Sequence, residues 1–119
     1  MAFSAEYASN HPTRDEIQGI VAPTVLEFGS PDCPHCQEAG PKVKAAFQDF
    51  PGIGHVKLED HEDKMLGRAF NVDKWPTLIF IQEGREVSRL VRPDNEDQIR
   101  DRMEDIDANP AQSAQIGGS

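Results

Sequence analysis

The segment TVLEFGSPDCPHC, residues 24–36, decides the fold that this sequence is expected to adopt. Its first five residues are mostly apolar and β-rich, which is typical of a strand covered on both faces, with Glu27 as the polar exception. A turn cluster, residues 29–32, follows the strand. Cys33 and Cys36 then stand where the turn leads into a helix. Both sulfur atoms can therefore lie on one face of the first helical turn.

The rest of the chain alternates helical and extended patterns around this segment. Thr13 and Glu16 form a capping-box pattern, and Pro41 predicts a kink in the helix that follows the cysteines. In chain order we expect a short helix from Thr13 that Pro23 stops, a strand over Thr24–Phe28, a helix over about Cys33–Phe50, a strand over His55–Glu59, a short helix around Met65–Phe70, a hairpin of strands over Thr77–Gln82 and Glu86–Val91, and a last helix capped by Asp94.

This order of elements predicts an α/β fold with three layers, α/β/α. The central sheet is expected to be mixed and four-stranded, with the first two strands parallel and the last two forming an antiparallel hairpin. A short extra N-terminal strand is a possible addition. A chain of 119 residues holds one domain of ordinary size. We assign residues 1–107 to that domain and interpret the small, polar residues 108–119 as a flexible C-terminal tail.

Composition and charge exclude several classes of partner. The chain has 12 Lys and Arg against 21 Asp and Glu, a formal net charge of −9, which repels nucleic acid phosphates and anionic lipid surfaces. No apolar run approaches the roughly 20 residues that span a bilayer. Residues 1–10 lack the basic and apolar regions of a secretory signal. We therefore expect a cytoplasmic protein that binds neither nucleic acid nor membrane. We also expect a monomer. A mature form with its signal removed is the alternative, against which Met1 counts.

The two cysteines of the chain point to redox chemistry. Cys33 and Cys36 are separated by only two residues, so a disulfide between them closes a very small loop and stabilises the fold little. The N-terminus of a helix favours a thiolate at Cys33, which makes Cys33 the expected nucleophile in attack on a partner's disulfide. Cys36 would then resolve the mixed disulfide. We expect no cofactor other than this redox-active pair.

Two other interpretations of the cysteines remain open. A structural zinc site needs four ligands, and without a second cysteine pair His35, His55 or His61 would have to be brought to the site by the fold. The cysteines could also be ordinary core residues. Pro34, at the first helical position, suits an exposed redox loop better than a core. Both interpretations are weaker than redox chemistry, and metal binding ranks above ordinary core cysteines.

Five motifs in order and spacing resemble the thioredoxin family over residues 13–107. They are Val25-Leu26-Glu27-Phe28, Cys33-Pro34-His35-Cys36, Pro41, Lys57-Leu58 and Trp75-Pro76-Thr77. The resemblance implies a thioredoxin-like fold and dithiol–disulfide exchange, with a cis Pro76 that faces the cysteine pair. The loop of Trp75, Pro76 and Thr77 would then bind an extended partner segment. A trans proline that merely begins an edge strand is the alternative for Pro76.

The resemblance also assigns roles to Glu27 and Lys57. Glu27 matches the buried acid beneath the cysteines, where the family more often has Asp, and a desolvated acid there could move the proton of the resolving thiol. Lys57 matches the basic residue that pairs with this acid. The alternative is that both side chains reach solvent from the strand ends.

Departures from the family pattern bear on redox potential and substrate range. Gly29 and Asp32 stand where thioredoxins usually carry tryptophans, and Pro34-His35 replaces Gly-Pro between the cysteines. The Pro-His pair resembles the loop of periplasmic disulfide oxidases, whose helical insertion has no room in 119 residues. A protonated His35 would raise the potential and Asp32 would oppose it. Arg92 replaces a glycine-containing turn, where it either adds positive charge near Cys33 or lies in solvent.

These observations lead to three hypotheses of function. The first is a thiol–disulfide oxidoreductase that acts on protein disulfides or thiols through Cys33 and is recycled by an unidentified reductase or dithiol donor. The second is a thioredoxin-fold binding or chaperone module that uses the surface of Trp75 and Pro76, with a regulatory cysteine pair. The third is a zinc or iron–sulfur site at Cys33 in a dimer.

Overall fold

The computed structural model describes residues 3–4, 6–8, 10–61 and 65–107. The predicted tail, residues 108–119, lies outside them. The described elements are α1 (Arg14–Gln18), β1 (Thr24–Gly29), α2 (Pro34–Phe47), β2 (Gly54–Glu59), α3 (Met65–Ala69), β3 (Thr77–Gln82), β4 (Arg85–Val91) and α4 (Glu96–Ile106). This is the predicted order of helices and strands.

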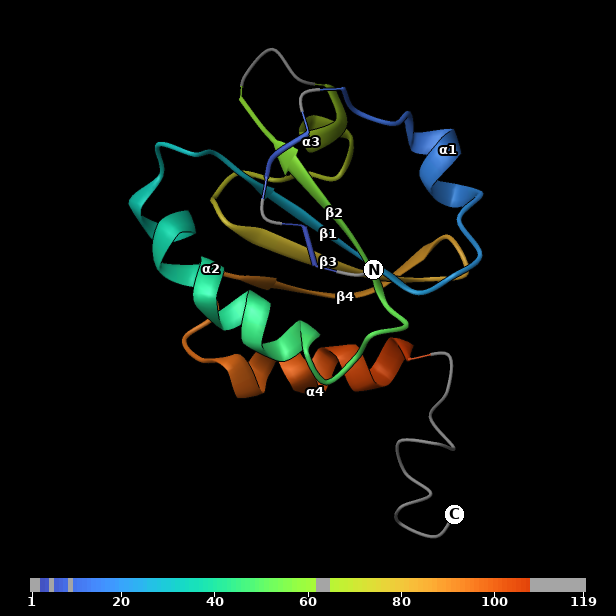
Figure 1. Cartoon of the computed structure of the whole chain (residues 1–119). Helices are drawn as coiled ribbons and strands as arrows, with labels where there is room; N and C mark the ends of the chain where they lie inside the picture. Colours follow the sequence, from blue (N-terminus) through green and yellow to red (C-terminus); the bar gives the residue numbers. More distant parts are fainter. Residues whose placement is uncertain (1–2, 5, 9, 62–64, 108–119) are drawn as a thin grey trace, which may run out of the picture.

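The four strands form one mixed sheet in the order β2-β1-β3-β4. Strands β1 and β2 are parallel, whereas β3 is antiparallel to both β1 and β4. Helices α2 and α4 cover one face of the sheet, and α1 and α3 lie on the other side (Figure 1). The predicted α/β/α sandwich is therefore confirmed. In place of a full extra strand, a single parallel bridge joins Ala8 to Leu58 at the outer edge of β2.

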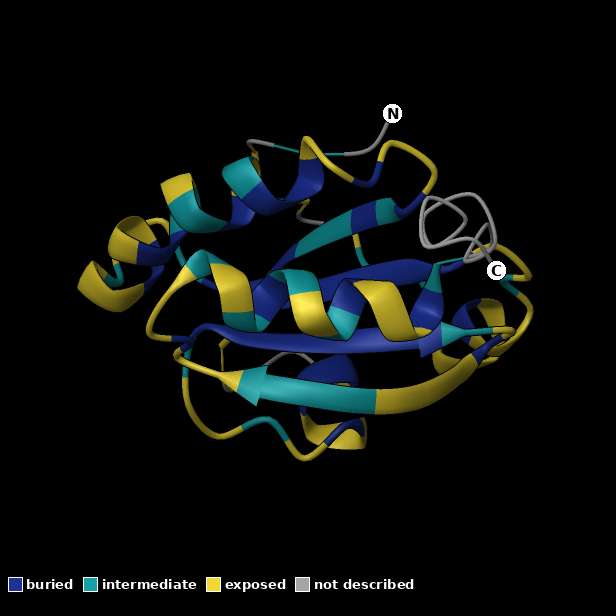
Figure 2. Cartoon of the chain, turned by 90° about the horizontal axis from the view of Figure 1, so that it is seen from below, coloured by how far each residue is buried: buried dark blue, intermediate teal, exposed yellow. Residues whose placement is uncertain are grey.

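Side chains that alternate along the strands divide the core between the two faces. Val25 and Phe80 point into the layer under α2 and α4, where Val43, Phe47, Ile99 and Met103 join them. Leu26, Phe28 and Ile79 point the other way, against Ile17 of α1 and Leu66 of α3. Strands β1 and β3 are dark blue along nearly their whole length in Figure 2, because both of their faces are covered. The end of β1, which leads to the cysteines, is thus buried between the two helical layers.

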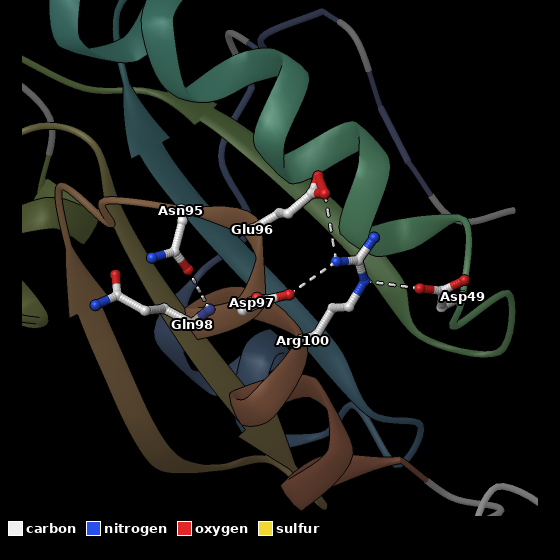
Figure 3. Close-up of polar contacts among 6 residues, drawn as sticks. All are labelled: Asp49, Asn95, Glu96, Asp97, Gln98 and Arg100. Atoms are coloured by element: carbon white, nitrogen blue, oxygen red, sulfur yellow. Dashed lines mark hydrogen bonds and ion pairs between the residues drawn. The ribbon is translucent and has the colours of Figure 1, made fainter.

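The helix ends differ from the sequence predictions at two points. Helix α2 ends at Phe47 rather than near Phe50, because the next amides, those of Asp49 and Phe50, donate to carbonyls only three residues back. Helix α4 is capped by Asn95 rather than Asp94, because the Asn95 Oδ1 atom accepts the amide of Gln98 at 3.0 Å (Figure 3).

One arginine ties α4 to the end of α2. The Arg100 guanidinium donates to Asp49 at 2.7 Å and also pairs with Glu96 and Asp97 on its own helix (Figure 3). These groups are partly exposed, so each pair contributes little stability. Among the described residues, no helix is long and apolar enough to cross a membrane.

Candidate active site

The two cysteines occupy the first turn of α2, as the spacing predicted. Cys33 is the N-cap residue, with φ −87° and ψ 118°, and its Sγ atom accepts the backbone N–H of Cys36 at 3.2 Å. Pro34 follows in the first helical turn, where its missing N–H leaves no unpaired donor. Both cysteines are free thiols; Cys33 is half-buried, and Cys36 is only 3% exposed. The pair thus has one sulfur that a partner can reach and one that it cannot.

Burial determines the protonation of the inner thiol. Desolvation, together with the hydrogen bond to Cys33, raises the pKa of Cys36 to about 11. Hydrogen bonds from the Ser30 backbone and from the Tyr7 hydroxyl act in the opposite direction. Cys36 is therefore a neutral thiol near pH 7, and it must lose its proton before it can act as a nucleophile.

The loop before β3 faces the cysteine pair. Its Trp75–Pro76 peptide bond is cis, and the Trp75 carbonyl oxygen lies 4.0 Å from the Cys33 sulfur. The Nε atom of Arg92 donates to the same carbonyl at 2.8 Å, and the Arg92 amide donates to the Pro76 carbonyl at 2.9 Å. Arg92 is exposed and has φ 51°. The structure thus brings Arg92 to the loop that contacts Cys33, with its guanidinium on the Trp75 carbonyl.

Side chains beneath this loop hold it in place. The Trp75 indole N–H donates to Asp60 Oδ2 at 3.0 Å, and the Asp60 amide donates to the Gly29 carbonyl at 2.8 Å. Thr77 is buried, and its hydroxyl donates to the Lys74 carbonyl at 2.6 Å. Trp75 itself stays half-exposed. Asp60 has no local sequence signal, because its partners lie 15 and 31 residues away along the chain.

Glu27 lies in β1 with its side chain 1% exposed, and it is linked to His55. The His55 Nε2 atom lies 2.8 Å from Glu27 Oε1, and the backbone N–H of Ser4 donates to His55 Nδ1 at 2.8 Å. Because an amide can only donate, Nδ1 accepts and Nε2 carries the proton that Glu27 receives as a hydrogen bond. The second carboxylate oxygen, Oε2, is buried and has no hydrogen-bond partner among the described residues.

Lys57, the predicted partner of this acid, lies on the neighbouring strand β2, and its pairing with Glu27 stays a prediction. Lys57 is the register neighbour of Glu27 across the β1–β2 pair. Its Nζ atom lies over the ring of Tyr7, 4.4 Å from the centroid, and His55 is hydrogen-bonded to Glu27 Oε1. The interpretation that the acid reaches solvent is wrong, because Glu27 is buried. The side chain of His55 was missed as a partner; it precedes Lys57 by two residues and so shares its face of the strand.

A cavity of about 400 Å³ lies between α2 and the turn after β4, and neither cysteine lines it. Exposed His35 lines it from α2, and Arg92 and Asp94 line it from the turn after β4. In the part of the chain that the structure describes, no group of three or more His, Cys, Asp or Glu side chains is arranged to hold a metal ion. The site has instead the parts of a dithiol centre: an accessible sulfur, a buried sulfur, a buried acid and a facing loop.

Comparisons with known proteins agree with this geometry. The thioredoxin family model matches residues 7–105. Among solved structures, reduced thioredoxin 2 from Pseudomonas aeruginosa PAO1 is 40% identical, with a TM-score of 0.78, and the alignment covers 87% of this chain and 96% of that one.

Curated relatives match over shorter segments. Thioredoxin H2 from Arabidopsis thaliana is 28% identical over 67 residues, which is 56% of this chain and 50% of the relative. Protein disulfide isomerase-like 1-4 from Oryza sativa subsp. japonica is 33% identical over 64 residues, 50% of this chain and 11% of the relative. The matched segment thus spans half or less of the length of these two relatives.

Proposed function

This chain belongs to the thioredoxin family, and we propose that it is a thiol–disulfide oxidoreductase that exchanges the Cys33/Cys36 dithiol with disulfides of protein substrates. One observation carries the proposal: a half-buried Cys33 caps α2, and a buried Cys36 lies in its first turn. No cofactor beyond the dithiol is needed. An unidentified reductase or dithiol donor would regenerate the pair. We propose the cytoplasm as the compartment, because thiols stay reduced there.

In the first step, the Cys33 thiolate attacks one sulfur of a substrate disulfide. A bond forms between the Cys33 sulfur and that atom, the substrate disulfide breaks, and the other substrate sulfur leaves with the electron pair and takes up a proton. The Cys36 amide supports this step, because it already donates to the Cys33 sulfur. The positive end of the α2 dipole acts in the same direction.

In the second step, Cys36 attacks the Cys33 sulfur. The Cys33–Cys36 disulfide forms, the bond from Cys33 to the substrate breaks, and the second substrate thiolate leaves and is protonated. Since burial raises the pKa of Cys36 to about 11, this step needs a proton acceptor. We propose Glu27, whose Oε2 atom is buried without a partner among the described side chains. Its charge also acts on Tyr7, which contacts Cys36.

The substitution Glu27→Gln tests this role. The carbonyl of the introduced amide can still accept the His55 Nε2 proton, so the packing is kept, but the amide cannot take up a proton. We expect release of the mixed disulfide to slow by at least about tenfold, in single-turnover reactions with a disulfide peptide between about pH 6 and pH 9. The control is the rate of Cys33 alkylation, which should hardly change. A release rate equal to that of the unsubstituted protein across this range would exclude Glu27 as the acceptor.

The loop of Trp75 and cis Pro76 is the proposed substrate contact. Trp75 is half-exposed, its carbonyl oxygen lies 4.0 Å from the Cys33 sulfur, and Asp60 and Arg92 hold its position. A protein segment that lies along this loop would bring its disulfide to the Cys33 sulfur. His35 and Arg92 on the neighbouring cavity wall would meet the side chains that flank that disulfide.

Two measurements test the proposed function. With dithiothreitol as donor, the protein should reduce insulin disulfides faster than dithiothreitol alone, and no acceleration would contradict the proposal. The midpoint potential of the pair in glutathione buffers then decides the direction of electron flow. A value near the cytosolic poise or below it identifies a reductase, and a much higher value identifies an oxidase or isomerase.

A further inference from the structure

The N-terminal segment brings a tyrosine to the resolving cysteine. Next to Tyr7, the Ala8 amide donates to the Lys57 carbonyl at 2.7 Å, and the Glu59 amide donates to the Ala8 carbonyl at 3.3 Å. These bonds hold the segment against the edge of β2, as the blue trace beside that strand shows in Figure 1. Tyr7 is half-buried and is the one tyrosine of the chain.

A glycine makes room for the tyrosine ring. A Cβ atom built on Gly29 would lie 2.7 Å from the Cys36 sulfur, 2.9 Å from the Tyr7 hydroxyl oxygen and 3.4 Å from Tyr7 Cε1. The sulfur and the hydroxyl therefore converge on the point where any other residue would carry its side chain. Contacts that short cannot be accommodated without displacing Tyr7 or Cys36.

The hydroxyl and the sulfur share a hydrogen bond, and its direction can be assigned. Burial, and then the charges of Cys36 and Glu27, raise the pKa of Tyr7 well above its ordinary value. The phenol therefore keeps its proton, and it is the donor when Cys36 ionises. Accordingly, this hydrogen bond lowers the pKa of Cys36, in opposition to burial. The charged and titratable groups that face Tyr7 are Cys36, Glu27, Cys33 and the Lys57 ammonium over its ring.

We propose that Tyr7 is a catalytic residue of the resolving step, whose hydroxyl donates a hydrogen bond to the Cys36 sulfur as the thiolate forms, and that Gly29 is required to admit it. The inference rests on the proposed oxidoreductase function. Tyr7 stays protonated throughout, and the thiol proton passes to Glu27 or to water. An electron pair of the Cys36 thiolate forms the bond to the Cys33 sulfur. The bond between Cys33 and the substrate breaks, and the substrate sulfur leaves with its electron pair.

Tyr7→Phe removes the hydroxyl and keeps the ring, together with its contact to Lys57. We expect the pKa of Cys36 to rise by about one unit, which is the effect of losing one hydrogen bond to a thiolate. The readout is the ¹³Cβ chemical shift of labelled Cys36 in the reduced protein, titrated from neutral pH. We also expect release of the mixed disulfide to slow by about tenfold at neutral pH. The rate of its formation at Cys33 should not change.

A second variant tests the part played by Gly29. Gly29→Ala should displace the hydroxyl and reproduce the rise in the Cys36 pKa, and the double variant with Tyr7→Phe should add little to either single change. Additive effects in the double variant would overturn the proposal. It would also be overturned if Tyr7→Phe had the same Cys36 pKa and the same release rate as the unsubstituted protein. If Gly29→Ala does not fold, as judged by circular dichroism, Tyr7→Phe alone decides.

The titration needs no substrate. It therefore tests the role of Tyr7 separately from the proposed oxidoreductase function. If the unsubstituted protein does not reduce insulin, the proposed function is refuted, and the Cys36 pKa still reports on Tyr7. A purely structural role of the tyrosine would lower the unfolding midpoint in urea and leave that pKa in place.

Discussion

Replacement of Cys33 by serine is expected to reduce insulin disulfide reduction to the rate of dithiothreitol alone. A hydroxyl at this position cannot form the mixed disulfide, and Cys36 is only 3% exposed, so it cannot meet a protein disulfide in its place. Loss of the nucleophile should lower the protein-catalysed part of the rate, above the dithiothreitol background, by at least about a thousandfold. The insulin turbidity assay measures it directly. Turnover retained by Cys33→Ser would contradict the assignment of the nucleophile.

The matched variant is Cys36→Ser, which keeps the first step and blocks the second. It should accumulate a stable mixed disulfide between Cys33 and the substrate, visible on a non-reducing gel and by mass spectrometry. If this variant released substrate at the normal rate, Cys36 would not be the resolving residue. A binding or chaperone module would behave differently, because it would hold its partner equally well with serine at position 33.

Replacement of His55 by leucine is expected to destabilise the fold by about 3 kcal/mol. His55 is the hydrogen-bond partner of Glu27 Oε1, and the ring also stacks on Phe47, with centroids 4.6 Å apart. Leucine has a similar volume, so the cost comes mainly from a buried carboxyl left without its donor. Urea unfolding, followed by the fluorescence of Trp75, the one tryptophan of the chain, measures the change.

Two further variants separate this cause from simple packing. In the double variant Glu27→Leu with His55→Leu, both polar partners are removed, and most of the stability should return. A double variant as unstable as the single one would show that packing of the ring, not the carboxyl, carries the loss. Val87→Ala, at a side chain 47% exposed on β4, is the surface control and should change stability by less than about 0.5 kcal/mol.

Local sequence patterns were sufficient to predict the helices and strands and the position of the cysteine pair at the start of α2. The apolar run of β1, the turn after it and Pro34 in the first turn of α2 all act within a few residues, so their consequences can be derived from the sequence. The ends of α2 and α4 were less certain. Asp94 and Asn95 are both good caps, and the choice of Asn95 depends on its extended backbone, with φ −152° and ψ 169°.

The residues around Glu27 and Gly29 could not be predicted from local sequence patterns. The resemblance identified Glu27 and offered Lys57 as its partner. His55 lies two residues earlier on the same face of β2, and Ser4, 51 residues away in sequence, sets its tautomer. Glycine at position 29, where thioredoxins usually carry an aromatic residue, was a visible departure. The reason for a glycine there is visible only in the folded chain, where Tyr7 of another segment occupies the space beside it.

Local sequence patterns are enough to predict the three-layer α/β fold and the chemistry that two cysteines at the start of a helix can perform. Hydrophobic periodicity, turn residues and capping patterns are properties of neighbouring residues, and they are enough to specify those features. The groups around the buried thiol and the facing loop could be identified only from the folded chain. The contacts of Tyr7 with Cys36, His55 with Glu27 and Asp60 with Trp75 join segments far apart along the chain, and no local pattern encodes them.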